Sequence, residues 1–179
     1  MSFIEIANHG EAVYIYRINM DMDQQHESPM KAAILLAKKG LDSNVGGPFG
    51  CVVVKDGVIV GKGSNRVTST NDPTAHAEVV AIRDACTNLN SFQLDGCEIY
   101  TNCEPCPMCL GAIYWARPKK VYFANTRHQA AEAGFDDAFI YEEIILDPSA
   151  RKIPMIHVPD NDAMQVFRDW IAKPDKTLY

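Results

Sequence analysis

Apolar residues recur at intervals of three and four along several segments of the chain, which is the pattern of a helix with one buried face. The first segment, residues 28–44, begins with Ser and Pro, a pair typical of a helix start. The second, residues 75–89, follows the turn-forming stretch Asn-Asp-Pro-Thr at 71–74. Three further helices are expected over residues 106–117, 138–144 and 161–173.

Short runs rich in β-branched and aromatic residues lie between these segments and predict strands. Residues 51–63, CVVVKDGVIVGKG, form two such runs joined by Asp56-Gly57, a strong signal for a two-residue hairpin turn. Single strands are expected over residues 97–103, 119–125 and 153–159, with a short one over 12–18. Alternating strands and helices predict a layered α/β domain, with a hairpin at one edge of the sheet and parallel pairing after it.

Length and charge narrow the choice of function. The 179 residues suit one domain, and 47% apolar with 22% charged residues is ordinary for a globular protein. Seventeen basic against 23 acidic residues give a net charge of −6, which favours a small neutral ligand over nucleic acid. No apolar run is long enough to span a membrane, and Glu5 and Glu11 stand where a signal peptide would carry cations. We therefore expect a cytoplasmic protein without membrane contact.

The six cysteines are expected to stay reduced in such a protein. Cys51, Cys86 and Cys97 lie in apolar or strand-like contexts and are interpreted as small buried side chains. Cys106 and Cys109 stand three residues apart at the start of a predicted helix, so their thiols project from the same end. Unpaired backbone N–H groups at a helix start stabilise thiolate, the form that binds zinc.

Another predicted helix start carries His76 and, two residues on, Glu78. Two helix starts facing one point would bring His76, Cys106 and Cys109 to a single Zn²⁺. Three protein ligands leave the fourth tetrahedral position for water, which becomes zinc hydroxide, the nucleophile, near neutral pH. Glu78 would then act as the proton shuttle. The combined pattern, His-x-Glu followed by Pro-Cys-x-x-Cys, is the signature of zinc nucleobase deaminases.

Two other interpretations of the cysteines are open. A Cys-x-x-Cys pair also occurs in redox dithiols, which need no dedicated histidine elsewhere. Alternatively, Cys103 completes a closed structural site of three cysteines and one histidine, and Glu78 is a solvated surface carboxylate. The closed site is disfavoured because Cys103, on a strand, is expected to point away from the pair at the helix start.

Four segments are similar in sequence to one family. GGPFG (46–50), NDPTAHAE (71–78), CEPCPMCLGAIYWARP (103–118) and AEAGFDDAFIY (131–141) resemble the bacterial guanine deaminases of the cytidine deaminase superfamily. The zinc signature identifies only the superfamily. The residues after the cysteines and the run 134–137 resemble the guanine deaminases within it. The resemblance implies a three-layer α/β/α fold around a mixed five-stranded sheet, and hydrolysis of guanine to xanthine and ammonia.

The resemblance also implies that Asp137 shares catalysis with Glu78. Guanine offers N–H donors at N1 and at its 2-amino group, which a carboxylate accepts. Asp137 would therefore orient the base and take part in proton transfer. Asp136 is its rival, and the sequence does not decide between them.

Aromatic and polar residues elsewhere are implied to bind the purine. Phe49 and Trp115 would be walls of the base pocket, although core packing explains such aromatics equally well. Asn65 would hydrogen-bond the purine, or would be a turn residue closing a strand. The implied substrate-binding residues are Phe49, Asn65, Ala77, Trp115, Asp137 and Tyr179.

By this resemblance the chain divides into an N-terminal extension of unknown role (1–27), a deaminase domain (28–173) and a C-terminal tail (174–179). In the family such a tail crosses to a partner subunit, so a homodimer with exchanged tails is expected; a frayed terminus is the alternative.

Guanosine, cytosine, cytidine, triazines or tRNA adenosine are alternative substrates within the same chemistry. A zinc-stabilised binding module without catalysis is the alternative from another class.

Overall fold

The computed structural model describes residues 4–8, 11–15 and 27–179. These residues belong to two compact units, Met1–Asp137 and Ala138–Tyr179, each of which is described by itself. Within the described part of the chain, no helix is both long and apolar enough to cross a membrane.

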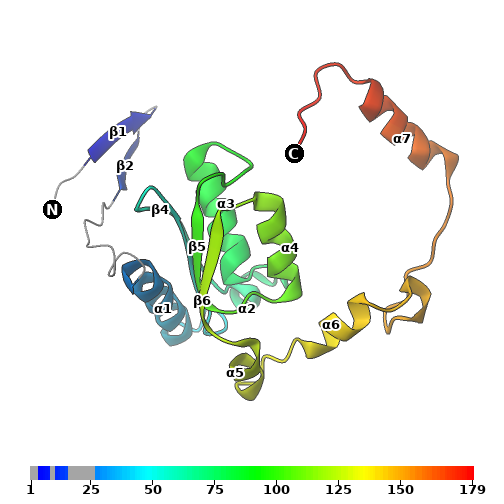
Figure 1. Ribbon diagram of the computed structural model, residues 1–179. Coiled ribbons are helices and arrows are strands. Elements are labelled where there is room, and N and C mark those ends of the chain that lie inside the picture. The colour runs from blue at the N-terminus through cyan, green and yellow to red at the C-terminus, as the bar shows by residue number, and fades with distance from the viewer. Residues whose placement is uncertain (1–3, 9–10, 16–26) are drawn as a thin grey trace. The chain divides into compact units, whose positions relative to one another are not determined.

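The first unit is built on a four-stranded sheet in the order β4-β3-β5-β6 (Figure 1). Its strands are β3 (Gly50–Lys55), β4 (Val58–Ser64), β5 (Glu98–Cys103) and β6 (Lys120–Asn125). β3 pairs antiparallel with β4 and β5, whereas β5 and β6 run parallel. The predicted hairpin at one edge and the predicted parallel pairing are therefore confirmed.

The expectation of five strands in this sheet is wrong, because among the residues that the structure describes the sheet has four. The segment IPMIHVP, residues 153–159, was expected to be a strand but is not one, and its side chains Ile153, Ile156 and Val158 are exposed. A strand exists only if a neighbour accepts and donates its ladder hydrogen bonds. Residues 153–159 lie in the second unit, whose described elements are all helical, so no strand of that unit is there to pair with them.

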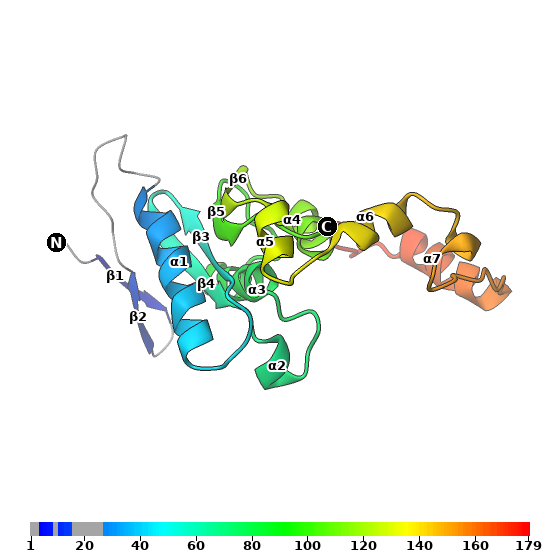
Figure 2. The same cartoon turned by 90° about the horizontal axis from the view of Figure 1, so that it is seen from below.

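Helices cover both faces of the sheet and make three layers (Figures 1 and 2). α1 (Glu27–Asp42) packs on the face formed by Val52, Val54 and Tyr100. The opposite face packs against α3 (Ala77–Leu89) and α4 (Pro107–Ala116). Side chains alternate between the two faces of a strand, so one apolar strand supplies both cores. The predicted three-layer α/β/α arrangement is confirmed.

Small residues let α3 lie unusually close to the sheet. A Cβ atom on Gly63 of β4 would lie 2.1 Å from the carbonyl oxygen of Ala77, at the first residue of α3. A Cβ on Gly61 would meet Ala81 and Ala85, one and two turns further along. Only glycine fits where backbone approaches backbone this closely. The first turn of α3, which follows His76, is thereby held against the sheet.

Some short elements were not predicted. α2 (Val67–Thr70) is one turn long. α5 (Arg127–Glu132) begins with a capping box in which Thr126 and Gln129 exchange hydrogen bonds. In the N-terminal segment, β1 (Ile4–Asn8) pairs antiparallel with β2 (Glu11–Ile15). β2 covers part of the strand expected over residues 12–18, of which 16–18 lie outside the described residues, and β1 was not expected.

The second unit consists of helices joined by extended chain. It contains α6 (Ala138–Ile144), the 3-10 turn η1 (Pro148–Ala150) and α7 (Asn161–Ala172). The two predicted helices are confirmed. None of its residues is buried, and α7 exposes Met164, Phe167 and Ile171 at helical spacing. The unit therefore lacks a hydrophobic core of its own.

Candidate active site

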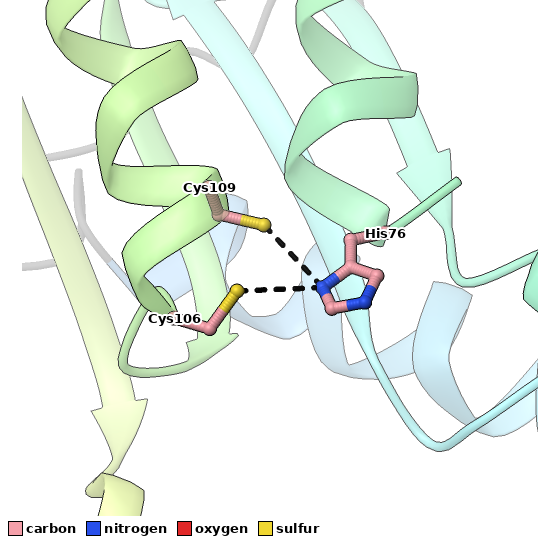
Figure 3. A group of neighbouring side chains, drawn as sticks. All are labelled: His76, Cys106 and Cys109. Carbon is pink, nitrogen blue, oxygen red and sulfur yellow. Dashed lines mark hydrogen bonds between the residues drawn. The ribbon is translucent and has the colours of Figure 1, made fainter. Parts of the chain in front are cut away.

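The starts of two helices meet at one side-chain cluster. His76 is the residue immediately before α3, and Cys106 holds the same position before α4, with Cys109 in the first turn. Figure 3 shows the three side chains pointing toward one another from these helix ends. His76 Nδ1 lies 3.6 Å from Cys106 Sγ and 3.5 Å from Cys109 Sγ. The structure thus brings the three predicted zinc ligands together, with their donor atoms all within 4.8 Å of one another.

The donor set of this cluster suits zinc. One imidazole nitrogen and two sulfurs are the atoms that Zn²⁺ prefers, and three ligands are typical of a catalytic rather than a structural site. Hydrogen bonding from Cys109, and from His76, lowers the pKa of the Cys106 thiol to about 4. The same bond between the two cysteines, together with burial, raises the pKa of Cys109. The lowered pKa of Cys106 favours the thiolate, the form of cysteine that binds a metal cation.

Glu78 lies in the interior beside this cluster. It occupies the first turn of α3, separated from His76 by the fully buried Ala77, and is only 5% exposed. Its Oε2 accepts a hydrogen bond from Cys109 Sγ at 3.3 Å, and burial raises its pKa. A buried carboxylate at this distance can exchange protons with a molecule bound at the cluster. This position contradicts the interpretation of Glu78 as a solvated surface carboxylate.

Cys103 does not join the metal-binding group. It ends β5, and its Sγ lies 3.9 Å from the carbonyl oxygen of Thr126. Burial, and the negative charge of Glu78, raise its pKa to about 11, so it is a neutral thiol. Among the described residues, the potential ligands that lie close together here are His76, Cys106 and Cys109. The described part of the chain therefore offers three protein ligands for a metal ion at this cluster, and Cys103 is not one of them.

Phe49 and Asn65 lie near one another on the loop before β3 and the turn after β4. The Phe49 ring packs edge-on against Phe135 with centroids 4.9 Å apart, and it also touches the core under α3. Asn65 is 6% exposed, and its Oδ1 accepts hydrogen bonds from Gly47 N at 3.1 Å and Val67 N at 3.2 Å. The turn role suggested for Asn65 is therefore real. These two hydrogen bonds fix the orientation of the Asn65 side-chain amide, with Oδ1 bound to the backbone.

Asn102 also holds the Phe49 loop, and the sequence analysis missed it. Its Oδ1 accepts from Gly50 N and its Nδ2 donates to the Pro48 carbonyl oxygen, both at 2.9 Å. These two bonds bracket Phe49 on either side. The available signal was an asparagine inside a predicted strand, a residue type depleted there. Its partners lie some fifty positions earlier in the chain, so local pattern did not reveal them.

The remaining predicted residues differ in how they relate to the cluster. Asp137 is half-buried, and burial, then the negative charge of Cys106, raises its pKa; Asp136 is exposed. Trp115 is 64% exposed and follows Cys106 by nine positions, about 13 Å along a helix axis. The structure does not bring it to the zinc ligands. Tyr179 belongs to the second unit.

A zinc-dependent deaminase is the class of protein that this layered domain and this cluster define, because a buried glutamate beside a histidine and two cysteines is its recurring arrangement. The model of one protein family, described as the cytidine and deoxycytidylate deaminase zinc-binding region, matches residues 23–125. The chain belongs to this family.

Several known proteins are similar to the chain. It is 56% identical over 154 residues to guanine deaminase of Bacillus subtilis, a match that covers 86% of the chain and 99% of that protein. A crystal structure of B. subtilis guanine deaminase matches with a TM-score of 0.84 and 54% identity, covering 86% of the chain and 98% of that structure. The tRNA-specific adenosine deaminase of Aquifex aeolicus is 43% identical over 146 residues, covering 80% of the chain and 92% of that protein.

Proposed function

We propose that the protein is a guanine deaminase, which hydrolyses guanine to xanthine and ammonia. The observation that carries this proposal is the 56% identity with a guanine deaminase over 99% of that relative's length. The geometry of the cluster supports it, because His76, Cys106, Cys109 and Glu78 are assembled as such a reaction needs. The zinc that these ligands would hold supplies a bound water with a pKa lowered to about 7.

Glu78 moves the protons in the proposed reaction. Water adds to the carbon that bears the amino group, and Glu78 takes a proton from that water. It delivers this proton to the purine ring nitrogen, then takes the remaining proton of the added hydroxyl and delivers it to the amine, which leaves as ammonia when the carbon–nitrogen bond breaks. Burial of Glu78 suits this task, since it raises the pKa of the carboxyl toward the range where a group both accepts and releases protons.

The proposed base pocket uses residues held by their neighbours. Phe49 packs on one face of the purine, from a loop that Asn65 and Asn102 clamp on both sides. Asn65 donates to the purine through Nδ2, because its Oδ1 already accepts two backbone N–H groups. Asp137 accepts from the N–H donors of guanine. A roughly planar ligand between an aromatic ring and a carboxylate is thus selected by shape and by donor pattern.

Asp137, rather than Asp136, is proposed to contact the base. The pKa of Asp137 responds to burial and to the charge of Cys106, whereas Asp136 is exposed. Asp137→Asn is therefore expected to lower kcat/KM for guanine by roughly 10²-fold or more with zinc content unchanged. Asp136→Asn is the matched control and is expected to stay within about threefold of wild type. Equal losses of kcat/KM in the two variants would contradict the proposal that Asp137, rather than Asp136, contacts the base.

A second candidate function is deamination of adenosine in tRNA, which the similarity to the Aquifex aeolicus protein favours. That reaction requires a surface that attracts the RNA backbone. The chain carries a net charge of −6 and so opposes such binding at neutral pH. Guanine, a neutral base, is the better match to this charge.

One assay separates these substrates. Ammonia release is measured with guanine, guanosine, adenine, cytosine, cytidine and a tRNA anticodon stem-loop, each offered to wild type and to Glu78→Ala. The proposal expects release from guanine above all others, and loss of that release in Glu78→Ala. Preference for another base would overturn the substrate while leaving the zinc chemistry intact. Activity equal in both proteins would overturn the catalytic role of the cluster.

The proposed assembly is a homodimer in which the C-terminal tail of one subunit closes the site of the other. Support comes from the second unit, which buries none of its residues and exposes apolar side chains of α7 together with Leu178 and Tyr179. Apolar surface on this scale is normally covered in the working protein. The surface of α4, with Tyr114 and Trp115 exposed, offers further area for a second copy.

Deleting residues 174–179 is expected to lower kcat/KM for guanine about tenfold or more and to leave zinc bound. The reason is that an open site admits water and loses the contact proposed for Tyr179. Kinetics and light scattering should be measured on the same samples, with Lys176→Ala as a control that keeps the tail. Unchanged kinetics in the deletion would show that the tail does not close the site.

The broader organisation is proposed on the same basis. We divide the chain into an extension at 1–27, the deaminase domain at 28–173 and the tail at 174–179. The six cysteines are all free in the structure, which supports a reducing, cytoplasmic location.

A further inference from the structure

A buried threonine touches the carboxylate of Glu78. Thr101 lies in β5, is 0% exposed, and its Oγ1 is 3.3 Å from Glu78 Oε1. A hydroxyl in a protein interior needs a hydrogen-bond partner, and among the described residues that partner is Glu78. The sequence analysis did not single out Thr101, because threonine is ordinary in a strand.

The two oxygens of Glu78 face different surroundings. Oε1 meets the Thr101 hydroxyl on the sheet, and Oε2 meets Cys109 Sγ at 3.3 Å in the zinc-ligand cluster. Thr101 thus binds the carboxylate oxygen that is not bonded to Cys109. A hydrogen-bond donor at Oε1 determines that Oε2 is the oxygen turned toward the zinc-ligand cluster.

The backbone and the side chain of Thr101 both have little conformational freedom. It pairs with Cys51 of β3 on one side and with Phe123 of β6 on the other, so its backbone is held by two neighbouring strands. Its β-branched side chain has few accessible rotamers. The flexible glutamate side chain therefore gains a fixed point of attachment on a strand that is paired on both sides.

We propose that Thr101 is a positioning residue for the reaction. It donates its O–H to Glu78 Oε1 and thereby holds Oε2 toward the zinc ligands and the substrate. The inference rests on the proposed function, since it assigns Thr101 a role through Glu78. It concerns the orientation of the carboxylate only, and Thr101 itself touches neither substrate nor ligand.

Two substitutions at this position separate orientation from packing. Thr101→Val keeps the branched shape and removes the hydroxyl, whereas Thr101→Ser keeps the hydroxyl and removes a methyl group. For Thr101→Val we expect kcat for guanine to fall about 10- to 100-fold, with KM within about twofold and zinc content unchanged. Thr101→Ser is expected to retain most of the wild-type kcat. Wild-type kcat in Thr101→Val, or equal losses in both variants, would overturn the proposal.

A second measurement does not depend on turnover. Unfolding midpoints of the zinc-free protein are compared for wild type, Thr101→Val, Glu78→Ala and the double variant. If the Thr101 hydroxyl acts through the Glu78 carboxylate, the unfolding midpoint of the double variant should change by less than the sum of the changes in the two single variants. Additive shifts would overturn the contact. If wild type releases ammonia from another base instead of guanine, the proposed function fails, and the same variants test Thr101 on that base.

Discussion

Replacing Glu78 by glutamine is expected to lower kcat for guanine by about 10²- to 10⁴-fold while the protein keeps its zinc and its fold. Glutamine has almost the same shape, and its side-chain oxygen still accepts from the Thr101 hydroxyl that now lies 3.3 Å from Oε1. What it loses is the capacity to take and release a proton. Steady-state kinetics, with zinc measured per chain by atomic emission, check this prediction.

Glu98→Gln is the matched control for this substitution. Glu98 begins β5 at the end away from the zinc ligands, and its Oε2 accepts a hydrogen bond from the Tyr100 hydroxyl. The same loss of one negative charge there should leave kcat within about twofold. If Glu78→Gln instead retained wild-type turnover, another group would have to carry the protons, and Asp137 would be the first to examine.

The zinc-ligand cluster could be predicted from sequence because the information is local. A histidine at one helix start and a cysteine pair at another each follow from a few adjacent residues, Thr74 to Glu78 and Glu104 to Cys109. Capping position decides where such side chains point, and the structure places His76 and Cys106 at equivalent positions before their helices. What the sequence leaves open is how closely the two helix starts approach.

The supporting residues could not be predicted because their partners are far away in sequence. Thr101 meets a residue 23 positions earlier, and Asn102 binds backbone atoms 52 and 54 positions earlier. Threonine is ordinary on a strand, and asparagine, although depleted there, does not indicate which distant atoms it binds. The role of Gly63 could not be predicted either, because the close approach of α3 to β4 that requires a glycine there is visible only in the structure.

The elements of the sheet were predicted well, and its size was not. The sequence pattern predicted a strand at IPMIHVP as well as at KKVYFAN, yet only the second segment has a neighbouring strand in its own unit, β5. Propensity describes one segment, whereas a sheet is a property of pairs. The helices of the second unit were predicted correctly because their hydrogen bonds are internal.

The second large effect is expected from the metal ligands themselves. Cys109→Ser should bind far less than about one zinc per chain, and kcat should fall by roughly 10³-fold or more, since the metal contributes several kcal/mol to such reactions. Cys103→Ser makes the same chemical change at the end of β5, at a buried thiol outside the ligand group. It is expected to keep both zinc and most of the activity. Loss of zinc from Cys103→Ser would support the closed four-ligand site.

Removal of zinc from the wild type separates an enzyme from a zinc-stabilised binding module. The core under α3 is formed by residues such as Val53, Ala81 and Ile99, and it includes none of the three ligands. The zinc-free protein should therefore keep its secondary structure and unfold cooperatively, at a somewhat lower temperature, while activity disappears and returns with added Zn²⁺. Circular dichroism and ammonia release on the same samples measure the two effects. Unfolding that accompanies zinc loss at every chelator concentration would instead assign the metal a structural role, because a closed site stabilises a fold that cannot form without it.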